Sequence, residues 1–255
     1  MPSPDPLVAR LRAAGCVFAE DEAALLREAA SGEALEELVA RRVRGEPLET
    51  LLGWAEFAGL RVAVAPGVFV PRRRSEALVE LALDGLPDGG VVVELCCGVG
   101  AIAAAIQARR SDARVWASDL DPDAVAVARR NLPPHAVLEG DLFEALPREL
   151  LGRVDVLVAN APYVPSDEIA FMPAEAREHE HRMALDGGAD GHAVQARIAS
   201  GCRAWLAPGG RVVIETSERQ AKRTASLLDE QGLRTRVVRD EDRDGTAVVG
   251  VLAAR

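Results

Sequence analysis

Apolar residues recur at helical spacing in the first part of the chain. Between residues 7 and 45 they fall at every third or fourth position, and polar residues fill the gaps. Asp21 and Ser31 stand where helix N-caps are expected, so the pattern predicts a small helical domain. Residues 54–70 then alternate between apolar and polar side chains around a turn at Gly59, which predicts a short β-hairpin.

From residue 76 the pattern changes to helices that alternate with short, largely apolar strands. The strands are predicted at residues 91–95, 115–118, 136–139, 154–159, 211–215, 234–239 and 247–252. Strands that alternate with helices imply right-handed crossovers and a mainly parallel sheet. Only a short turn separates the last two strands, which favours an antiparallel hairpin there. Seven strands that end in this way are typical of Rossmann-like, class I methyltransferases, so an α/β fold of this class is expected.

The composition is that of a globular protein. The 255 residues suffice for one large α/β domain and a small accessory domain, and 49% of them are hydrophobic. Aromatic residues make up only 4%, so the core must be built mainly from Ala, Val, Leu and Ile. No apolar run is long enough to cross a membrane, and residues 1–6 do not resemble a secretory signal. We therefore expect a cytoplasmic protein.

Charge and cysteine content narrow the range of partners. The formal net charge is −10, whereas proteins that bind nucleic acid normally present a basic surface. Nucleic-acid binding is therefore disfavoured, although Arg72-Arg73-Arg74 is compatible with an anionic partner. A solvated turn that leads into a helix is the expected state of at least two of these arginines. The four cysteines lack metal-knuckle spacing and are expected to be reduced thiols.

A glycine-containing loop follows the first strand of the predicted sheet. Glu94-Leu95-Cys96-Cys97-Gly98-Val99-Gly100 leads into a predicted helix, and glycine lets the backbone turn sharply and approach a ligand. A lone Gly-x-Gly also occurs in tight strand–helix turns. The second strand, however, ends at Asp119, whose carboxylate can accept hydrogen bonds from both hydroxyls of a ribose. A helix N-cap is the alternative role for Asp119, one that Asp121 can fill instead.

Further candidate cofactor residues are expected at the same end of the sheet. The Glu94 carboxylate can neutralise the cationic amino-acid end of S-adenosylmethionine, and Gly140-Asp141-Leu142 suits contact with adenine. The predicted cofactor-binding residues are Glu94, Cys96, Cys97, Gly98, Gly100, Asp119, Leu120, Asp141, Leu142 and Asn160. NAD is the alternative cofactor, but Ala101-Ile102-Ala103 lacks the third glycine of the usual dinucleotide loop.

The fourth strand ends in Asn160-Ala161-Pro162-Tyr163, the four residues predicted to be catalytic. Pro162 fixes its own φ and biases Ala161 toward an extended backbone. The Asn160 side-chain carbonyl and the Ala161 main-chain carbonyl can then grip an NH2 group, while the Tyr163 ring packs on the planar group beside it. Such a grip orients a conjugated nitrogen, which is a poor nucleophile, toward a sulfonium methyl group. The alternative is a proline-containing turn that only caps the strand.

Two other stretches contain side chains that can bind a metal or act as a nucleophile. Glu178-His179-Glu180-His181 has metal-binding side chains but lacks histidines at helical i, i+4 spacing, so no metal site is predicted. Cys97 would need a basic partner to act as a nucleophile, and the sequence identifies none. Packing beneath the cofactor is the expected role of Cys97.

The tetrapeptide resembles the Asn-Pro-Pro-Tyr motif of amino-group methyltransferases. The chain as a whole resembles the bacterial HemK/PrmC family of release-factor glutamine N5-methyltransferases, over nearly its whole length. The other stretches that carry the resemblance are Arg44-Gly45-Glu46-Pro47-Leu48, Gly53-Trp54-Ala55-Glu56-Phe57-Ala58-Gly59-Leu60, Pro66-Gly67-Val68-Phe69-Val70-Pro71-Arg72, Ala184-Leu185-Asp186-Gly187-Gly188 and Leu206-Ala207-Pro208-Gly209-Gly210.

The resemblance implies a helical substrate-binding domain with the hairpin over residues 1–70, and a methyltransferase domain over residues 71–255. It implies methyl transfer from S-adenosylmethionine to the side-chain amide of a protein glutamine. The implied acceptor is the glutamine of a Gly-Gly-Gln tripeptide in a peptide chain release factor, which places the reaction in translation termination. A protein partner is therefore expected, and neither a membrane nor a nucleic acid.

The chain departs from the family pattern at four places. The first proline of the motif is Ala161, the family's Gly-Thr is Cys96-Cys97, and an often aromatic position is Leu142. Arg74 replaces an acid in Pro71-Arg72-Arg73-Arg74-Ser75-Glu76, where the family has Pro-Arg-x-Glu-Thr-Glu. Two other functions stay open. The tetrapeptide also suits methylation of an exocyclic amine of adenine or guanine in RNA or DNA, because that amine is planar and conjugated too, and Ala161 motivates a non-catalytic cofactor-binding relative.

Overall fold

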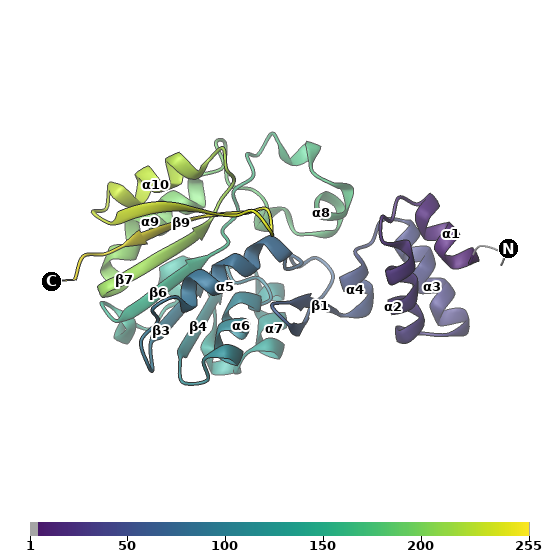
Figure 1. Ribbon diagram of the computed structural model, residues 1–255, viewed down its shortest axis with the longest axis horizontal. Coiled ribbons are helices and arrows are strands. Elements are labelled where there is room, and N and C mark those ends of the chain that lie inside the picture. Colours follow the sequence, from purple (N-terminus) through teal and green to yellow (C-terminus); the bar gives the residue numbers. More distant parts are fainter. Residues whose placement is uncertain (1–4, 255) are drawn as a thin grey trace.

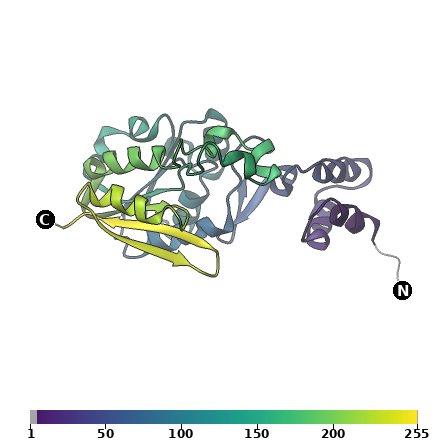
Figure 2. The ribbon, with the colours of Figure 1, turned by 90° about the horizontal axis from the view of Figure 1, so that it is seen from above.

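The computed structural model describes residues 5–254. Residues 1–4, on which the expectation of no secretory signal partly rests, lie outside the described part. Figure 1 shows a large sheet domain with a smaller helical unit at one end, and the helical unit carries the N-terminus. Viewed from above, the helical unit projects away from the sheet domain (Figure 2).

The helical unit has a hydrophobic core of its own. Helices α1 (Pro6–Ala13), α2 (Ala19–Ala29) and α3 (Gly32–Val43) form this unit, and the short helix α4 (Leu48–Leu52) follows them. Leu11, Leu26 and Val39, one from each of the first three helices, are fully buried between them. The helical spacing of apolar residues therefore predicted these helices correctly.

The predicted N-caps of these helices are only partly correct. Ser31 occupies the N-cap position of α3, as expected, although its side chain makes no capping hydrogen bond. Asp21 is not a cap, because α2 already begins at Ala19 and Phe18 is its N-cap residue. Asp21 lies in the first turn, where its negative charge interacts favourably with the helix dipole.

Seven strands of the described residues form one sheet, in the order β5-β4-β3-β6-β7-β9-β8. The strands are β3 (Val91–Leu95), β4 (Arg114–Asp119), β5 (Val137–Glu139), β6 (Val154–Ala159), β7 (Leu206–Glu215), β8 (Arg234–Asp240) and β9 (Gly245–Val251). The first five pair in parallel, and β9 pairs antiparallel with both β7 and β8. This arrangement confirms the predicted α/β fold of class I methyltransferases, with its terminal antiparallel hairpin.

One strand differs from its predicted extent by more than two residues. Strand β7 begins at Leu206, five positions before the predicted start, because Leu206 pairs with Val154 and the register then shifts. The pairing resumes at Arg211 opposite Val156, so residues 207–210 bulge out opposite a single residue of β6. A bulge of this kind interrupts the alternation of apolar and polar residues along a strand. The sequence pattern therefore predicted only the second part of β7.

Helices cover both faces of the sheet (Figure 1). Helices α5 (Glu76–Leu83), α6 (Ala101–Arg109) and α7 (Pro122–Asn131) pack on one face, while α9 (Ala193–Trp205) and α10 (Ala221–Asp229) pack on the other. Both layers are built largely from Ala, Val, Leu and Ile, as the composition predicted. Among the described residues, no helix is both long enough and apolar enough to span a membrane.

The hairpin of β1 (Trp54–Phe57) and β2 (Leu60–Ala63) joins the sheet domain. Its inward side chains Ala55, Phe57 and Val62 belong to the same buried cluster as helices α5 to α7. The strands are shorter than the predicted 54–70, since regular pairing ends at residue 63. Helix α8 (Ala174–His179) lies in the segment between β6 and α9, and its Glu175 pairs with Arg42 of α3. This contact ties the helical unit to the segment beside the sheet end.

Candidate functional site

A cavity lies at the carboxyl ends of β3, β4 and β6, where the strand order reverses. It holds about 1300 Å³ of space, its open mouth included. Its wall contains every predicted cofactor-binding or catalytic residue except Gly100, namely Glu94, Cys96, Cys97, Gly98, Asp119, Leu120, Asp141, Leu142, Asn160, Ala161, Pro162 and Tyr163. The topology of the parallel sheet therefore brings together residues from four separate loops.

The two glycines of the loop after β3 have different surroundings. Both have left-handed backbones, with φ of +53° at Gly98 and +73° at Gly100. A Cβ on Gly98 would meet no atom within 4 Å, so this glycine leaves room in the cavity wall for a ligand to approach. A Cβ on Gly100 would lie 2.8 Å from Cδ1 of Leu132, so Gly100 allows α6 to pack closely on the end of α7.

Gly98→Ala and Gly100→Ala are therefore expected to affect different properties. Gly100→Ala should lower the free energy of unfolding by about 1–3 kcal/mol, because the methyl group overpacks against Leu132 in a strained backbone. Gly98→Ala carries the backbone strain without the overpacking, so it should destabilise the fold less than Gly100→Ala and should in addition weaken cofactor binding, because its methyl group occupies the cavity. Urea unfolding and calorimetric titration with S-adenosylmethionine separate the two effects. Equal destabilisation by both variants, with unchanged cofactor affinity, would contradict this assignment.

Asp119 is fixed by the backbone of the cofactor loop. Its Oδ2 accepts a hydrogen bond of 2.7 Å from the Gly98 amide, and its Oδ1 accepts one of 2.9 Å from the Asp121 amide. Burial raises the pKa of Asp119 above its usual value. Each carboxylate oxygen keeps a further lone pair, which suits the hydroxyls of a ribose. Asp121 is the N-cap of α7, with its Oδ1 2.9 Å from the Asp123 amide, and so fills the alternative role weighed for Asp119.

Glu94 is buried at the carboxyl end of β3, and part of it lines the cavity. Its Oε2 accepts a hydrogen bond of 2.8 Å from the Ala103 amide in the first turn of α6. Burial, together with the nearby negative charge of Asp119, raises the pKa of Glu94 to about 8. A cation in the cavity would favour the ionised carboxylate, so the residue fits the cationic end of S-adenosylmethionine.

This shift predicts how stability changes with pH. The folded protein holds the proton of Glu94 up to about pH 8, whereas the unfolded chain releases it near the ordinary glutamate pKa of 4.5. The contribution of this proton to stability is therefore lost as pH rises through this interval. Glu94→Gln keeps an oxygen for the Ala103 amide and cannot ionise. We expect the free energy of unfolding to fall between about pH 5 and pH 8 more steeply in the native chain than in Glu94→Gln. Parallel slopes in urea unfolding at several pH values would contradict this.

The opposite side of the cavity is formed by Asp141, Leu142 and the two cysteines. Arg197 of α9 also lines the cavity, and its Nη2 donates a hydrogen bond of 2.7 Å to Oδ2 of Asp141. Cys96 has a left-handed φ of +54° at the position where the family pattern has glycine. Burial raises the pKa of both Cys96 and Cys97, which keeps them as neutral thiols that are poor nucleophiles.

Asn160 and Ala161 present two unpaired oxygens at the cavity. Nδ2 of Asn160 donates a hydrogen bond of 3.1 Å to Oγ of the buried Ser75, which orients the amide. Among residues 5–254, neither Oδ1 of Asn160 nor the carbonyl oxygen of Ala161 accepts a hydrogen bond. Both residues line the cavity, so they retain acceptors for the hydrogens of an incoming group.

Tyr163 is held from three sides. Gln220 donates a hydrogen bond of 2.9 Å to its carbonyl oxygen, and Gly187 packs so closely that a Cβ there would lie 2.7 Å from Cα of Tyr163. Its hydroxyl lies 3.4 Å from Oε1 of Glu215, a buried residue at the end of β7. Burial raises the pKa of Tyr163, so the phenol stays neutral beside the cavity.

The arginines of residues 72–74 are not all solvated, which corrects the expectation for at least two of them. Arg72 pairs with the buried Glu180, and Arg74 pairs with the buried Glu215 at 3.1 Å. Buried carboxylates need a counter-charge, and the turn before α5 supplies it to both. The turn itself leads into a helix as predicted.

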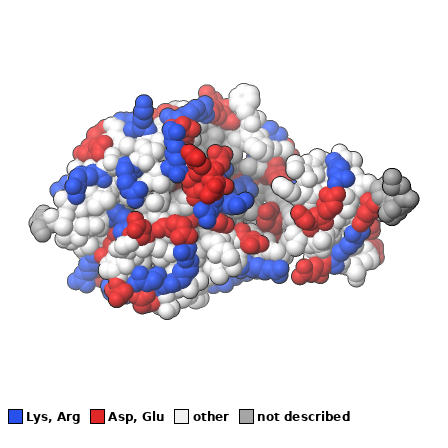
Figure 3. All heavy atoms as spheres, in the orientation of Figure 1, with Lys and Arg blue, Asp and Glu red and all other residues white. Residues whose placement is uncertain are grey.

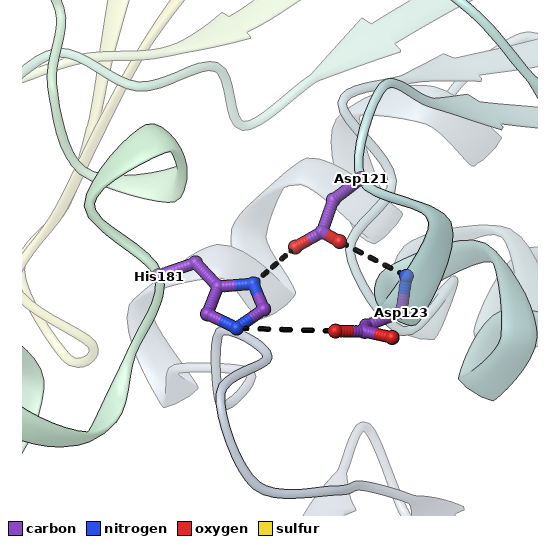
Figure 4. Close-up of side chains that lie close together, drawn as sticks. All are labelled: Asp121, Asp123 and His181. Atoms are coloured by element: carbon purple, nitrogen blue, oxygen red, sulfur yellow. Dashed lines mark hydrogen bonds and ion pairs between the residues drawn. The ribbon is translucent and has the colours of Figure 1, made fainter.

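His181 connects the segment after α8 to the cofactor side of the cavity (Figure 4). Its Nδ1 lies 2.6 Å from Oδ2 of Asp121, and its Nε2 lies 3.9 Å from Oδ2 of Asp123. These three residues offer possible metal-ligand atoms within 4.8 Å of one another. However, Asp121 uses one oxygen for His181 and the other for the cap of α7, so we interpret the group as a structural link. The absence of a metal site stays a prediction.

Three residues of the site were not identified from the sequence: Ser75, Arg197 and Glu215. Glu215 is the last residue of a predicted strand, and the carboxyl end of that strand lies at the same edge of the sheet as the site. An acidic residue at that position could therefore have been predicted to belong to the site. Ser75 lies on a short turn and Arg197 within a helix, and no local pattern distinguishes either from an ordinary polar residue.

Comparisons with known proteins agree with this geometry. The family described as "Methyltransferase small domain" matches residues 59–179. The release factor glutamine methyltransferase of Geobacter sulfurreducens is 37% identical over 199 residues, which cover 76% of this chain and 69% of that protein. The release factor glutamine methyltransferase of Mycolicibacterium smegmatis is 39% identical over 217 residues, which cover 83% of this chain and 76% of that protein.

Solved structures share the fold. A methyltransferase from Pyrococcus furiosus superimposes with a TM-score of 0.58 at 16% identity, and the match covers 76% of this chain and 90% of that protein. At this identity the likeness shows the fold alone, which is that of the class I methyltransferases.

Proposed function

Because this chain belongs to the family of release factor glutamine methyltransferases, we propose that it methylates the glutamine of the Gly-Gly-Gln tripeptide in a peptide chain release factor. S-adenosylmethionine is the methyl donor of the family and supplies an electrophilic methyl group. The methyl group would pass to the side-chain amide nitrogen of the glutamine as its bond to the sulfonium sulfur breaks. A neutral thioether would leave, and the nitrogen would lose a proton to water. No strong general base is needed, because a protonated amide is very acidic.

One observation carries this proposal: the pair of unpaired oxygens on Asn160 and Ala161 at the cavity wall. An amide NH2 group has two hydrogens, and two fixed acceptors are what is needed to orient it. In this assignment the acceptors draw the nitrogen lone pair into line with the methyl group and stabilise the positive charge that develops. Tyr163 packs on the planar amide.

The residues at the cofactor end of the cavity are assigned from their geometry as well. Asp119 would hold the ribose hydroxyls, Glu94 the cationic amino-acid end, and the backbone at Gly98 would lie against the cofactor. Asp141, Leu142 and Leu120 would surround the adenine, and Cys96 and Cys97 would pack beneath the cofactor. The orientation of Asp119 by two backbone amides and the free space at Gly98 support this placement.

We also assign a partner role to the N-terminal part of the chain. In place of the expected boundary at residue 70, the helices α1 to α4 would bind the release factor, because the hairpin shares the core of the sheet domain, and the remainder of the chain would carry the reaction. The separate hydrophobic core of α1 to α3 and the position of the helical unit beside the cavity segment support this division. The cytoplasm, where release factors act, is the corresponding location.

Methylation of a nucleic-acid amine is disfavoured by the surface charge. On the face shown in Figure 3, acidic and basic side chains are interspersed and form no continuous basic surface. The decisive test incubates the purified chain with labelled S-adenosylmethionine and a cell extract, followed by protease or nuclease. The proposal predicts label that protease releases and nuclease does not. Label that only nuclease releases would contradict it, and so would a chain that binds the cofactor but labels nothing.

A further inference from the structure

Arg74 occupies an unusual place for a basic residue. It lies on the turn at residues 73–75, between the cavity and the end of β7, and its side chain is 41% exposed. The next residue, Ser75, orients Asn160, and the hydroxyl of Tyr163 lies beside Arg74 itself. Arg74 is therefore at the end of the cavity where the acceptor nitrogen has been placed.

The pairing of Arg74 leaves most of its hydrogen-bond donors free. Its Nε donates a hydrogen bond of 3.1 Å to Oε1 of Glu215, and the Tyr163 hydroxyl lies beside the same guanidinium. Glu215 is 1% exposed, and its second oxygen has no hydrogen bond. A guanidinium has five N–H groups, so four remain on the two Nη atoms. The neighbouring Tyr163 hydroxyl can engage one of them, which leaves at least three for a ligand.

A peptide acceptor offers groups that match these donors. When a glutamine side chain enters the cavity, its own main chain lies at the mouth and presents carbonyl oxygens. A guanidinium fork donates well to such oxygens, whereas the acid of the family pattern at this position can only accept. Glu215 holds the guanidinium in place, so little freedom is lost when it binds.

We propose that Arg74 is an acceptor-recognition residue whose Nη groups donate to a main-chain carbonyl oxygen of the peptide segment that carries the methylated glutamine. This inference rests on the proposed function and adds to it a specificity element in which this chain departs from its family. Glu215 is the positioning residue that holds Arg74 and, through the same oxygen, lies beside the Tyr163 hydroxyl.

The test compares steady-state kinetics on purified release factor in a background that carries Glu215→Gln. This background removes the buried charge, so that changing Arg74 does not leave a carboxylate unpaired. Arg74→Gln in this background should raise KM for the release factor at least about tenfold over Glu215→Gln alone. Arg74→Lys should recover only part of the loss, because a point charge lacks the planar fork. The affinity for S-adenosylmethionine, measured by calorimetry, should not change.

Arg243→Gln is the matched control, since Arg243 pairs with Glu76 near the same turn and does not line the cavity. It should leave KM for the release factor unchanged. A KM that stays within about twofold in Arg74→Gln, or a loss confined to cofactor affinity, would overturn the role of Arg74 alone. No transfer to release factor by the native chain would overturn the proposed function, and this inference with it.

Discussion

Asn160→Ala is expected to lower kcat by about 10²- to 10³-fold while S-adenosylmethionine still binds. The substitution removes the side-chain oxygen that is assigned to grip the acceptor amide, and that grip matters most when charge develops on the nitrogen. Asn160 is also a candidate cofactor-binding residue, so kcat and cofactor affinity must be measured together. A loss of cofactor affinity with unchanged kcat would reassign Asn160 to the cofactor.

Ser75 provides a graded control for this effect. Ser75→Ala keeps the Asn160 amide but removes the hydrogen bond that orients it, so we expect a fall in kcat of about tenfold, smaller than for Asn160→Ala. Ser75→Thr retains the hydroxyl and should restore activity. If Ser75→Ala and Ser75→Thr are equally impaired while both remain folded, the hydrogen bond is not what positions Asn160.

Asp119→Asn is expected to weaken the binding of S-adenosylmethionine by about 10- to 100-fold. The substitution removes the charge, and it places an NH2 group opposite a backbone amide that now donates to the carboxylate, either that of Gly98 or that of Asp121. Both the ribose contact and the fixed shape of the cofactor loop should suffer. Calorimetric titration at equal protein concentration measures the effect directly.

Asp123→Asn is the matched control for Asp119→Asn. Asp123 follows four positions later in the chain, is largely exposed and does not line the cavity. It should bind S-adenosylmethionine like the native chain. Equal weakening by the two substitutions would point to the general negative charge of the region, and not to a specific contact of Asp119.

The fold and the cofactor end of the site followed from local patterns in the sequence. The carboxyl ends of parallel strands lie at one edge of a sheet. Once the strands were predicted, it followed that Glu94, Asp119, Asp141 and Asn160 lie close together. Gly100 shows the limit of this reasoning. It belongs to the same short motif as Gly98, but its neighbour is Leu132, which only the packing of α7 brings near.

The part of the site that is assigned to the methyl acceptor is formed by contacts between distant parts of the chain. Asn160 and Ser75 are 85 positions apart, and Tyr163 and Glu215 are 52 apart, so no local spacing relates them. The arginines before α5 were expected in solvent because their partners, Glu180 and Glu215, are buried on other elements. Pairing of this kind follows from the tertiary fold, since a buried carboxylate requires a nearby cation.

The most direct measurement is fragmentation mass spectrometry of purified release factor after incubation with this chain and S-adenosylmethionine. The account predicts one added methyl group, on the side-chain nitrogen of the glutamine in Gly-Gly-Gln, and no addition with Asn160→Ala. A release factor that stays unmodified, or carries the methyl group on another residue, while the chain binds S-adenosylmethionine, would contradict it.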